Sequence, residues 1–223
     1  MLFRSHIEVS KKVLARRTAK AMKVIEKKKV DNINIIREEI KIHLLLDNQN
    51  IIKLYSYSET NDYFYLIMEY ASKGNIFNEI KTKSTYNESV TRNYFIQTIN
   101  GIAYLHSLGY VHRDIKPSNF VMGNKEGTNK DKLYIVDFGL AKHHLDKNGN
   151  SHIPKKQSEF RGTLTYASMN AHNKKELGRR DDLFSFFFIV LEMLGVKLPW
   201  RDSSKKANIF NFGYSKVKAN STS

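Results

Sequence analysis

The sequence predicts an α+β fold in two lobes, with a small β-sheet and one helix in the first lobe and mainly helices in the second. Short apolar and polar alternation, typical of half-exposed strands, occurs mainly before Tyr70, whereas helical periodicity prevails after Gly74. The chain has 223 residues, 41% hydrophobic and 26% charged, enough for one core or two small lobes that share an interface. We assign residues 1–70 to the first lobe, 71–207 to the second and 208–223 to a polar tail.

Five segments have the composition of strands. Residues 18–26 alternate in polarity, and residues 51–59 and 63–70 are rich in β-branched and aromatic side chains on either side of a turn. The last two are therefore expected to pair. In the second lobe, short apolar runs at 119–122 and 132–138 are joined by a glycine-containing loop and predict a second strand pair.

Three segments have helical periodicity. Residues 34–46 predict an amphipathic helix in the first lobe, and residues 90–105 and 182–194 predict two helices in the second. The apolar positions of the first helix are Ile36, Ile40, Ile42, Leu44 and Leu45. One face of the second helix is expected to contain Phe95, Ile99, Ile102 and Leu105.

The chain is strongly basic, with a formal net charge of +15 and a pI near 9.7, so its surface attracts anions. Its basic residues are spread out and match no nucleic-acid-binding motif, so we expect a solvated surface and no nucleic-acid partner. No export signal is visible, and the most apolar run, residues 184–196, is too short to span a bilayer. The absence of cysteine fits a reducing compartment, and we expect a cytoplasmic or nuclear protein.

The string HRDIKPSNF at 112–120 and the triplet DFG at 137–139 form the protein kinase signature. Either triplet alone occurs by chance in surface loops, but both in this order, between strand-like segments, predict a phosphoryl-transfer centre. Such a centre needs a positioned hydroxyl, neutralised phosphates and metal ions held between them.

Each side chain of the signature fits one of these needs. Asp114 is expected to accept the proton of the attacking hydroxyl, while Lys116 places its ammonium group against the γ-phosphoryl group. Asn119 and Asp137 offer oxygen ligands, which Mg²⁺ prefers. The expected catalytic residues are thus Asp114, Lys116 and Asn119, and the expected cofactors are ATP and Mg²⁺.

Lys23 is a candidate phosphate-binding residue because the helix that follows it offers an acidic partner. An ion pair between Lys23 and Glu39 would hold the lysine against the α- and β-phosphates of ATP. Glu38 is the competing partner, although the helix register favours Glu39. The predicted adenine-binding hinge, with Met68 as gatekeeper, consists of Met68, Glu69, Tyr70 and Ala71. A simple strand end is the alternative interpretation of that hinge.

The eight histidines include one cluster, which we tested as a metal site. Its spacing matches no zinc pattern, and adjacent histidines seldom ligate one ion together, so we expect a solvated loop. The cluster consists of His143, His144, Asp146 and His152.

The second half of the chain resembles the casein kinase 1 group, most closely its tau-tubulin kinase branch. The segments that carry the resemblance are HRDIKPSNFVMG, YIVDFGLAK, HIP, FRGTLTYASMNAH, ELGRRDDLFS and LPWR. The KPSN form of the loop resembles Ser/Thr rather than Tyr kinases, and SMN at 168–170 resembles the SIN form that replaces APE in this group. The first part of the chain is more similar to calmodulin-dependent and related kinases.

The resemblance implies a two-lobed kinase fold that transfers the γ-phosphate of ATP to Ser or Thr of protein substrates. It also implies that Asp182 braces the backbone of the catalytic loop and that Thr163 lies near Asp114. Acidic or phosphate-primed substrates are implied by arginines in the anion-binding region of this group, Arg161, Arg179 and Arg180.

Three features depart from the family pattern. The first 73 residues contain no glycine, and residues such as Arg4 and Ile7 occupy the expected glycine-rich loop, so ATP should bind less well. His43 stands where the internal apolar stack usually has a leucine-like side chain, which should loosen the active arrangement. The sequence stops soon after Trp200, before several helices of the larger lobe, so both ends are expected to be truncated.

These departures leave alternatives to an active enzyme. The chain is either a Ser/Thr protein kinase, a catalytically weak or inactive kinase-like binding module, or a fragment of a longer kinase. A basic nucleic-acid-binding protein is a further hypothesis, which rests on charge alone.

Overall fold

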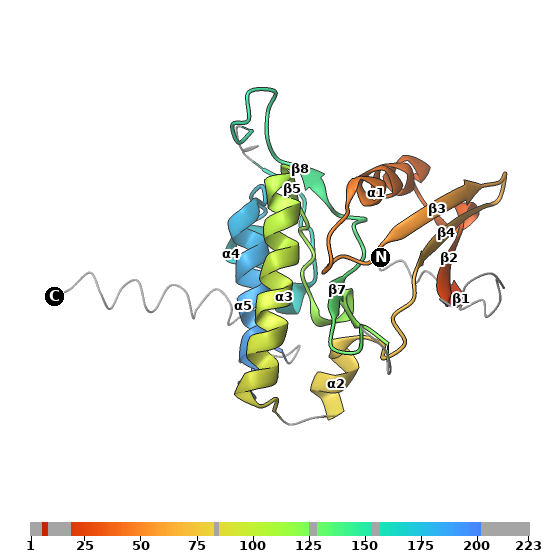
Figure 1. Cartoon of the computed structure of the whole chain (residues 1–223). Helices are drawn as coiled ribbons and strands as arrows, with labels where there is room; N and C mark the ends of the chain where they lie inside the picture. The colour runs from red at the N-terminus through yellow and green to blue at the C-terminus, as the bar shows by residue number, and fades with distance from the viewer. Residues whose placement is uncertain (1–5, 9–18, 83–84, 125–128, 153–156, 202–223) are drawn as a thin grey trace.

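The computed structural model describes residues 6–8, 19–82, 85–124, 129–152 and 157–201 (Figure 1). Within this part the fold is α+β with two lobes, as the sequence predicts. The predictions for Arg4 in the glycine-rich loop, Thr18 at the start of a strand and the tail 208–223 lie outside the described residues.

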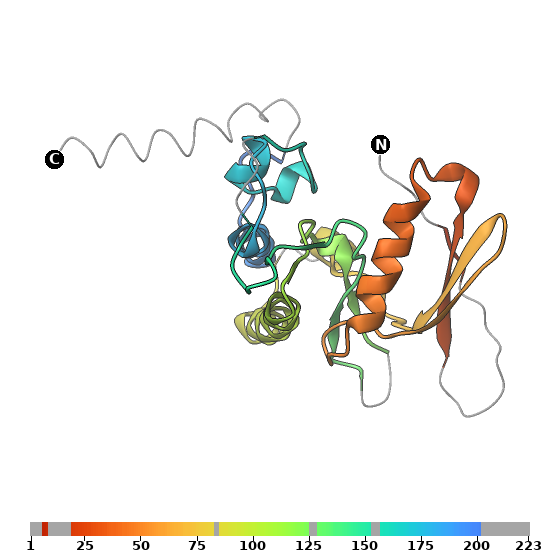
Figure 2. The same cartoon turned by 90° about the horizontal axis from the view of Figure 1, so that it is seen from above.

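The first lobe contains an antiparallel sheet in the order β1-β2-β4-β3, with the helix α1 beside it (Figure 2). The elements are β1 (His6–Glu8), β2 (Lys20–Glu26), α1 (Ile33–Leu45), β3 (Leu54–Glu59) and β4 (Tyr63–Glu69). The side chain of Asn32 caps α1 by accepting a hydrogen bond from Asn34 N, which satisfies one free amide at the helix start. The core of this lobe is formed by Ile25, Ile40, Leu54, Phe64 and Leu66.

Helix α1 buries part of its predicted apolar face, including Ile40 and Ile42, but not its last two leucines. Leu44 and Leu45 were expected on the apolar face but are 45% and 60% exposed, whereas Glu39 and His43 are buried. The buried positions follow the three- and four-residue spacing of one helical face, which places both leucines on the other side. The inward face of α1 therefore carries two buried polar side chains, Glu39 and His43.

The second lobe is mainly helical and contains two short strand pairs, β5 with β8 and β6 with β7. The expected helices at 90–105 and 182–194 correspond to α3 and α5, and the expected strand pair corresponds to β6 and β7. The helices are α2 (Ile76–Thr82), α3 (Glu88–Ser107), α4 (Met169–His172) and α5 (Arg179–Met193). The strands are β5 (Tyr110–Val111), β6 (Phe120–Met122), β7 (Leu133–Ile135) and β8 (Lys142–His143). Short 3₁₀ helices cover Lys27–Lys29, Pro117–Asn119 and Leu164–Tyr166.

On α3, Ile102 and Leu105 are buried as expected, but Phe95 is 42% exposed. Its ring contacts that of Phe186 on α5, with ring centroids 5.2 Å apart. Phe95 thus lies at the margin of the α3–α5 contact rather than inside it.

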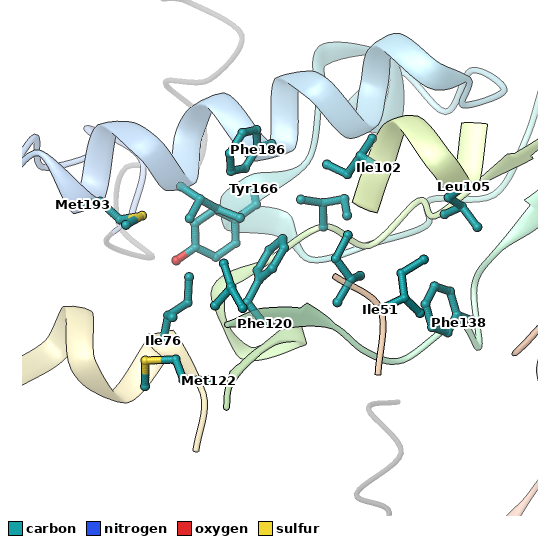
Figure 3. Close-up of a cluster of buried hydrophobic side chains, with 14 of the residues drawn as sticks. Ile51, Ile76, Ile102, Leu105, Phe120, Met122, Phe138, Tyr166, Phe186 and Met193 are labelled. Carbon is teal, nitrogen blue, oxygen red and sulfur yellow. The ribbon is translucent and has the colours of Figure 1, made fainter. Parts of the chain in front are cut away.

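The larger core continues from one lobe into the other (Figure 3). Ile51, from the segment between α1 and β3, packs in the same cluster as Phe138, Phe120 and Leu105. The backbone joins the lobes at the same place, because Ile135 N donates to Asn50 O at 2.8 Å and Ile52 N donates to Ile135 O at 3.1 Å. Strand β7 is therefore fastened to the first lobe.

Among the described helices, none is both long and apolar enough to cross a bilayer.

Candidate active site

The loop that contains HRDIKPSNF leaves β5 and reaches β6 through the 3₁₀ helix Pro117–Asn119. Asp182 on α5, which is 1% exposed, holds the start of this loop. Its carboxylate accepts hydrogen bonds from the backbone N of His112 and of Arg113, each at 2.8 Å, and lies 2.8 Å from His106 Nε2. One buried carboxylate thus fixes the loop backbone, at the position that the family resemblance implied for Asp182.

The carboxylate of Asp114 is the meeting point of the loop. Lys116 Nζ lies 2.6 Å from Asp114 Oδ2, and Thr163 Oγ1 donates to Oδ1 at 2.8 Å. Asn119 Nδ2 donates to the backbone O of Asp114 at 3.0 Å, which ties its amide nitrogen to the loop. The structure therefore brings together the three residues predicted to be catalytic, with Thr163 beside Asp114 as the family resemblance implied.

The DFG segment packs its phenylalanine inward. Phe138 is 1% exposed and its ring lies between two imidazoles, with centroid distances of 5.0 Å to His43 and 5.4 Å to His112. Asp137 has a positive φ of 69°, and its side chain is exposed. Burial of Phe138 thus accompanies presentation of Asp137 to solvent.

Lys23 pairs with Glu39 and not with Glu38. Lys23 Nζ lies 2.8 Å from Glu39 Oε1, and the two side chains are 13% and 5% exposed. Glu38 instead forms an exposed ion pair with Lys41. Burial alone would lower the pKa of Lys23, but the carboxylates of Glu39 and Asp137 outweigh it and raise that pKa, so the lysine stays charged.

The oxygen donors of the site suit a hard divalent cation. Although the residue as a whole is exposed, desolvation by the surrounding protein opposes ionisation of the Asp137 carboxyl group. Nearby positive charge, that of Lys23 first, outweighs this and lowers its pKa, so the carboxylate is ionised. Within the described residues Asp137 forms no ion pair and accepts only a long hydrogen bond from Gly139 N, at 3.5 Å. Asn119 uses its amide nitrogen on the loop, which leaves its oxygen as the group that can bind a metal.

The predicted hinge begins at the end of β4. Met68 packs against the core of the first lobe, and Glu69 N donates to Lys53 O at 2.8 Å. The Glu69 side chain turns toward Tyr134, whose hydroxyl donates to Oε1 at 2.7 Å. The side chain of Glu69 is thus engaged inside the protein, and Ala71 lies two residues further along the connection to α2.

His43, the departure in the internal stack, is hydrogen-bonded rather than unsatisfied. It is 3% exposed, and its Nε2 lies 2.8 Å from Ile52 O. Burial is the largest influence on this group and lowers its pKa, so the ring is neutral and donates its proton to the carbonyl. Where a leucine-like side chain would make only apolar contacts, the imidazole of His43 makes a hydrogen bond to Ile52 O.

A basic hollow of about 410 Å³ lies beside Arg113, the residue before Asp114. Burial lowers the pKa of Arg113, and the neighbouring charge of Arg161 lowers it further. Two acids also line the hollow and pair with two of its cations, Glu176 with Lys142 and Glu159 with Arg161. The predicted Arg161 lines the hollow, whereas Arg179 and Arg180 are not among its lining residues. Sequence reasoning assigned no role to its other cations, Arg113, Lys142 and Lys175.

The histidine cluster after DFG makes backbone contacts. His143 Nδ1 lies 3.0 Å from Leu145 O, and His144 Nδ1 lies 2.7 Å from Gly109 O. In the part of the chain that the structure describes, no three His, Cys, Asp or Glu side chains are grouped so that they could hold a metal ion.

Comparison with known proteins agrees with this geometry. A family model described as the protein kinase domain matches residues 8–221, nearly the whole chain. The chain belongs to the protein kinase family.

Two curated proteins illustrate the relationship of this kinase domain to others. A Dictyostelium discoideum protein named "Probable serine/threonine-protein kinase" is 38% identical over 152 residues, 67% of this chain. The serine/threonine-protein kinase PKH2 of Candida albicans is 31% identical over 185 residues, 82% of this chain. The kinase domain described here covers 30% of the length of the first relative and 19% of the second.

Proposed function

We propose that this kinase domain is a serine/threonine protein kinase that transfers the γ-phosphate of ATP to Ser or Thr side chains of proteins. The observation that carries the proposal is the convergence of Lys116 and Thr163 on the carboxylate of Asp114. The names of both relatives support serine/threonine specificity.

In the proposed reaction, Asp114 orients the substrate hydroxyl and accepts its proton as the oxygen attacks. Lys116, 2.6 Å from that carboxylate, neutralises charge on the phosphoryl group in transfer. Asp137 and Asn119 would hold Mg²⁺, which neutralises the phosphates when bound. Lys23, held by Glu39, binds the α- and β-phosphates.

The adenine would bind along the hinge, residues 68–71. Because the Glu69 side chain is hydrogen-bonded to Tyr134 and its backbone N–H to Lys53 O, we expect the backbone groups of Tyr70 and Ala71 to bind the base. Met68 would lie behind the base as gatekeeper.

A direct test is phosphorylation of casein and of the chain itself with ATP and Mg²⁺ or Mn²⁺. Transfer to Ser or Thr that disappears in Asp114→Asn supports the proposal. Purified chain that binds Mg²⁺–ATP and transfers no phosphate contradicts it.

Within this function, we propose casein kinase 1-like selection of acidic or phosphate-primed substrates. The hollow supports this, because Arg113 precedes Asp114 in the chain and because, among the described residues, neither Arg113 nor Lys175 forms an ion pair, whereas Arg161 is paired with Glu159. A phosphoserine on the substrate side would gain charge-assisted hydrogen bonds there.

Paired peptides, with and without a phosphoserine near the acceptor, test this selection. Arg161→Ala and Lys175→Ala should each raise KM for the phosphorylated peptide several-fold and leave the other peptide unaffected. Arg180→Ala is the matched control, because this exposed arginine lies outside the lining of the hollow. Equal use of both peptides by the unmodified protein rules the selection out.

A second candidate, a nucleotide-binding module with weak or no transfer, is favoured by the absence of glycine from the first 73 residues. Backbone amides of a glycine-rich loop approach phosphates closely, and other residues keep them further away. Thermal-shift titration separates the two, because stabilisation by Mg²⁺–ATP without any transfer supports the module.

A further inference from the structure

A cluster of hydrogen bonds joins the hinge to the second lobe. Glu69, the last residue of β4, accepts two hydrogen bonds at Oε1, from the Tyr134 hydroxyl at 2.7 Å and from Asn129 Nδ2 at 3.3 Å. Tyr134 lies in β7 and is 2% exposed, and Glu69 is half-buried. A single carboxylate oxygen of the first lobe thus holds two donors from the strand pair of the second lobe.

The strand pair is shaped so that Asn129 can reach the hinge. A side chain at Gly123 would place its Cβ only 1.8 Å from the backbone O of Asn129, so the close approach requires glycine. Gly123 N also donates to Lys132 O at 2.8 Å, which closes the end of the β6–β7 pair. The position of Asn129 therefore depends on backbone geometry and not on a mobile contact.

Tyr134 is a stable donor in this cluster. The pKa of its hydroxyl is raised above the ordinary value, mainly by burial and secondly by the hydrogen bond to Glu69. The phenol therefore keeps its proton at neutral pH, and the proton lies on the Tyr134 side of the bond.

Strand β7 links the cluster to the metal site. Tyr134 precedes Asp137 by three positions, and between them Ile135 is bonded through its backbone to Asn50 and Ile52. A displacement of Tyr134 relative to Glu69 is therefore a displacement of the DFG segment relative to the hinge.

We propose that Glu69 and Tyr134 are positioning residues, whose hydrogen bond holds the adenine-binding hinge in register with Asp137 and sets the rate of nucleotide exchange. The proposal rests on the proposed function, because it requires the hinge to bind adenine. The backbone bonds of Ile135 to Asn50 and Ile52 remain when this bond is lost, so the loss should free the hinge from β7 rather than separate the lobes. Bound nucleotide should then leave faster while the residues that contact phosphate are unchanged.

The test is Tyr134→Phe, which removes one hydroxyl and keeps the ring. Dissociation of a fluorescent ADP analogue with Mg²⁺ should be about fivefold faster, the size expected for the loss of one hydrogen bond of average net strength. Tyr86→Phe is the matched control, because Tyr86 donates to Glu79 Oε2 at 2.8 Å, the same chemistry inside the second lobe. It should leave the dissociation rate unchanged.

A double-variant cycle isolates the pair. Glu69→Ala should also speed dissociation, and adding Tyr134→Phe to it should produce no further change, because the bond is already lost. Hydrogen exchange of the hinge amides, residues 68–71, should be faster in Tyr134→Phe than in Tyr86→Phe before any nucleotide is added.

The outcomes separate the two hypotheses. Nucleotide binding with equal dissociation rates in Tyr134→Phe and Tyr86→Phe overturns the positioning role alone. Additive effects of Glu69→Ala and Tyr134→Phe overturn it as well. A folded, unmodified chain that binds no nucleotide overturns both the proposed function and the positioning role.

Discussion

The ammonium group of Lys23 lies 2.8 Å from Oε1 of Glu39, and this ion pair joins the central strand β2 to helix α1. Glu39 is 5% exposed, so its charge depends on the lysine for compensation. The same helix contributes His43, whose ring contacts Phe138 of the DFG segment. The position of α1 therefore governs both the lysine and the DFG segment.

Lys23→Met should lower phosphate transfer at least about a hundredfold, the effect of removing a charged group from a phosphate clamp. It should also destabilise the chain by about 3 kcal/mol, because Glu39 becomes a buried charge without a partner. Combining it with Glu39→Gln should recover most of the stability and none of the activity. Urea unfolding and a kinase assay measure the two effects, and equal losses of stability in the single and double variants contradict the ion-pair explanation.

Asp114→Asn should reduce kcat by about a thousandfold with little change in KM for ATP, since the proton acceptor is lost while phosphate contacts remain. The amide keeps the shape of the side chain and can still accept from Thr163, but its nitrogen cannot pair with Lys116, so the melting temperature should fall only slightly. Asp31→Asn, at an exposed position, is the control. Retention of more than a tenth of the activity in Asp114→Asn excludes Asp114 as the base.

Asp182→Asn should loosen the backbone of the catalytic loop, which the Asp182 carboxylate holds through hydrogen bonds. The carboxylate accepts from His112 N, Arg113 N and His106 through two oxygens, whereas the amide has only one acceptor oxygen. At least one buried donor therefore loses its acceptor. We expect a loss of about 2 kcal/mol in the free energy of unfolding and a lower kcat. Hydrogen exchange at residues 112–114 should rise more than in β2, and uniform acceleration through the chain contradicts a local role.

His43 should make stability pH-dependent on the acid side. Its pKa lies below the ordinary 6.5, so between these two values the unfolded chain binds a proton that the folded chain does not. The free energy of unfolding therefore falls as pH drops below 6.5, by up to about 1.4 kcal/mol per pH unit for this group.

Urea unfolding between pH 5 and 7.5 tests this dependence. His43→Leu should flatten the slope below pH 6.5, while His152→Gln, at an exposed site, should not. His144 and His172 also have lowered pKa values and contribute to the slope in both proteins, so the difference isolates His43. Parallel curves for the unmodified protein and His43→Leu exclude the contribution of His43.

The strands and main helices could be predicted from the sequence because their signals are local periodicities, and β2, β3, β4, α1, α3 and α5 lie where those signals placed them. Which face of α1 is buried could not be fully predicted. Leu44 and Leu45 continue an apolar run, yet the sheet packs against the neighbouring face and leaves them exposed. Apolar content alone does not show which side of a helix has a partner.

In the wider site, too, the sequence predicted some residues and only the packing of the lobes showed the others. Arg161, Arg179 and Arg180 were expected in an anion-binding region, and Arg161 lines a hollow together with three cations that sequence reasoning did not single out, Arg113, Lys142 and Lys175. The bond between Glu69 and Tyr134 joins residues 65 positions apart, and no motif marked it. Such contacts depend on how the two lobes pack.

The chemistry of residues 112–119 and of the DFG triplet was determined by the sequence itself. Each motif is a few consecutive residues, and the pairing of the neighbouring strands β6 and β7 brings the two together. Tertiary structure decided the partners that reach this loop from elsewhere. It selected Glu39 over Glu38 for Lys23, and it placed Asp182 beneath the loop and Tyr134 against the hinge. Hydrogen bonds and ion pairs act over a few ångströms, so only the packing of α1, α5 and β7 could determine which distant groups meet.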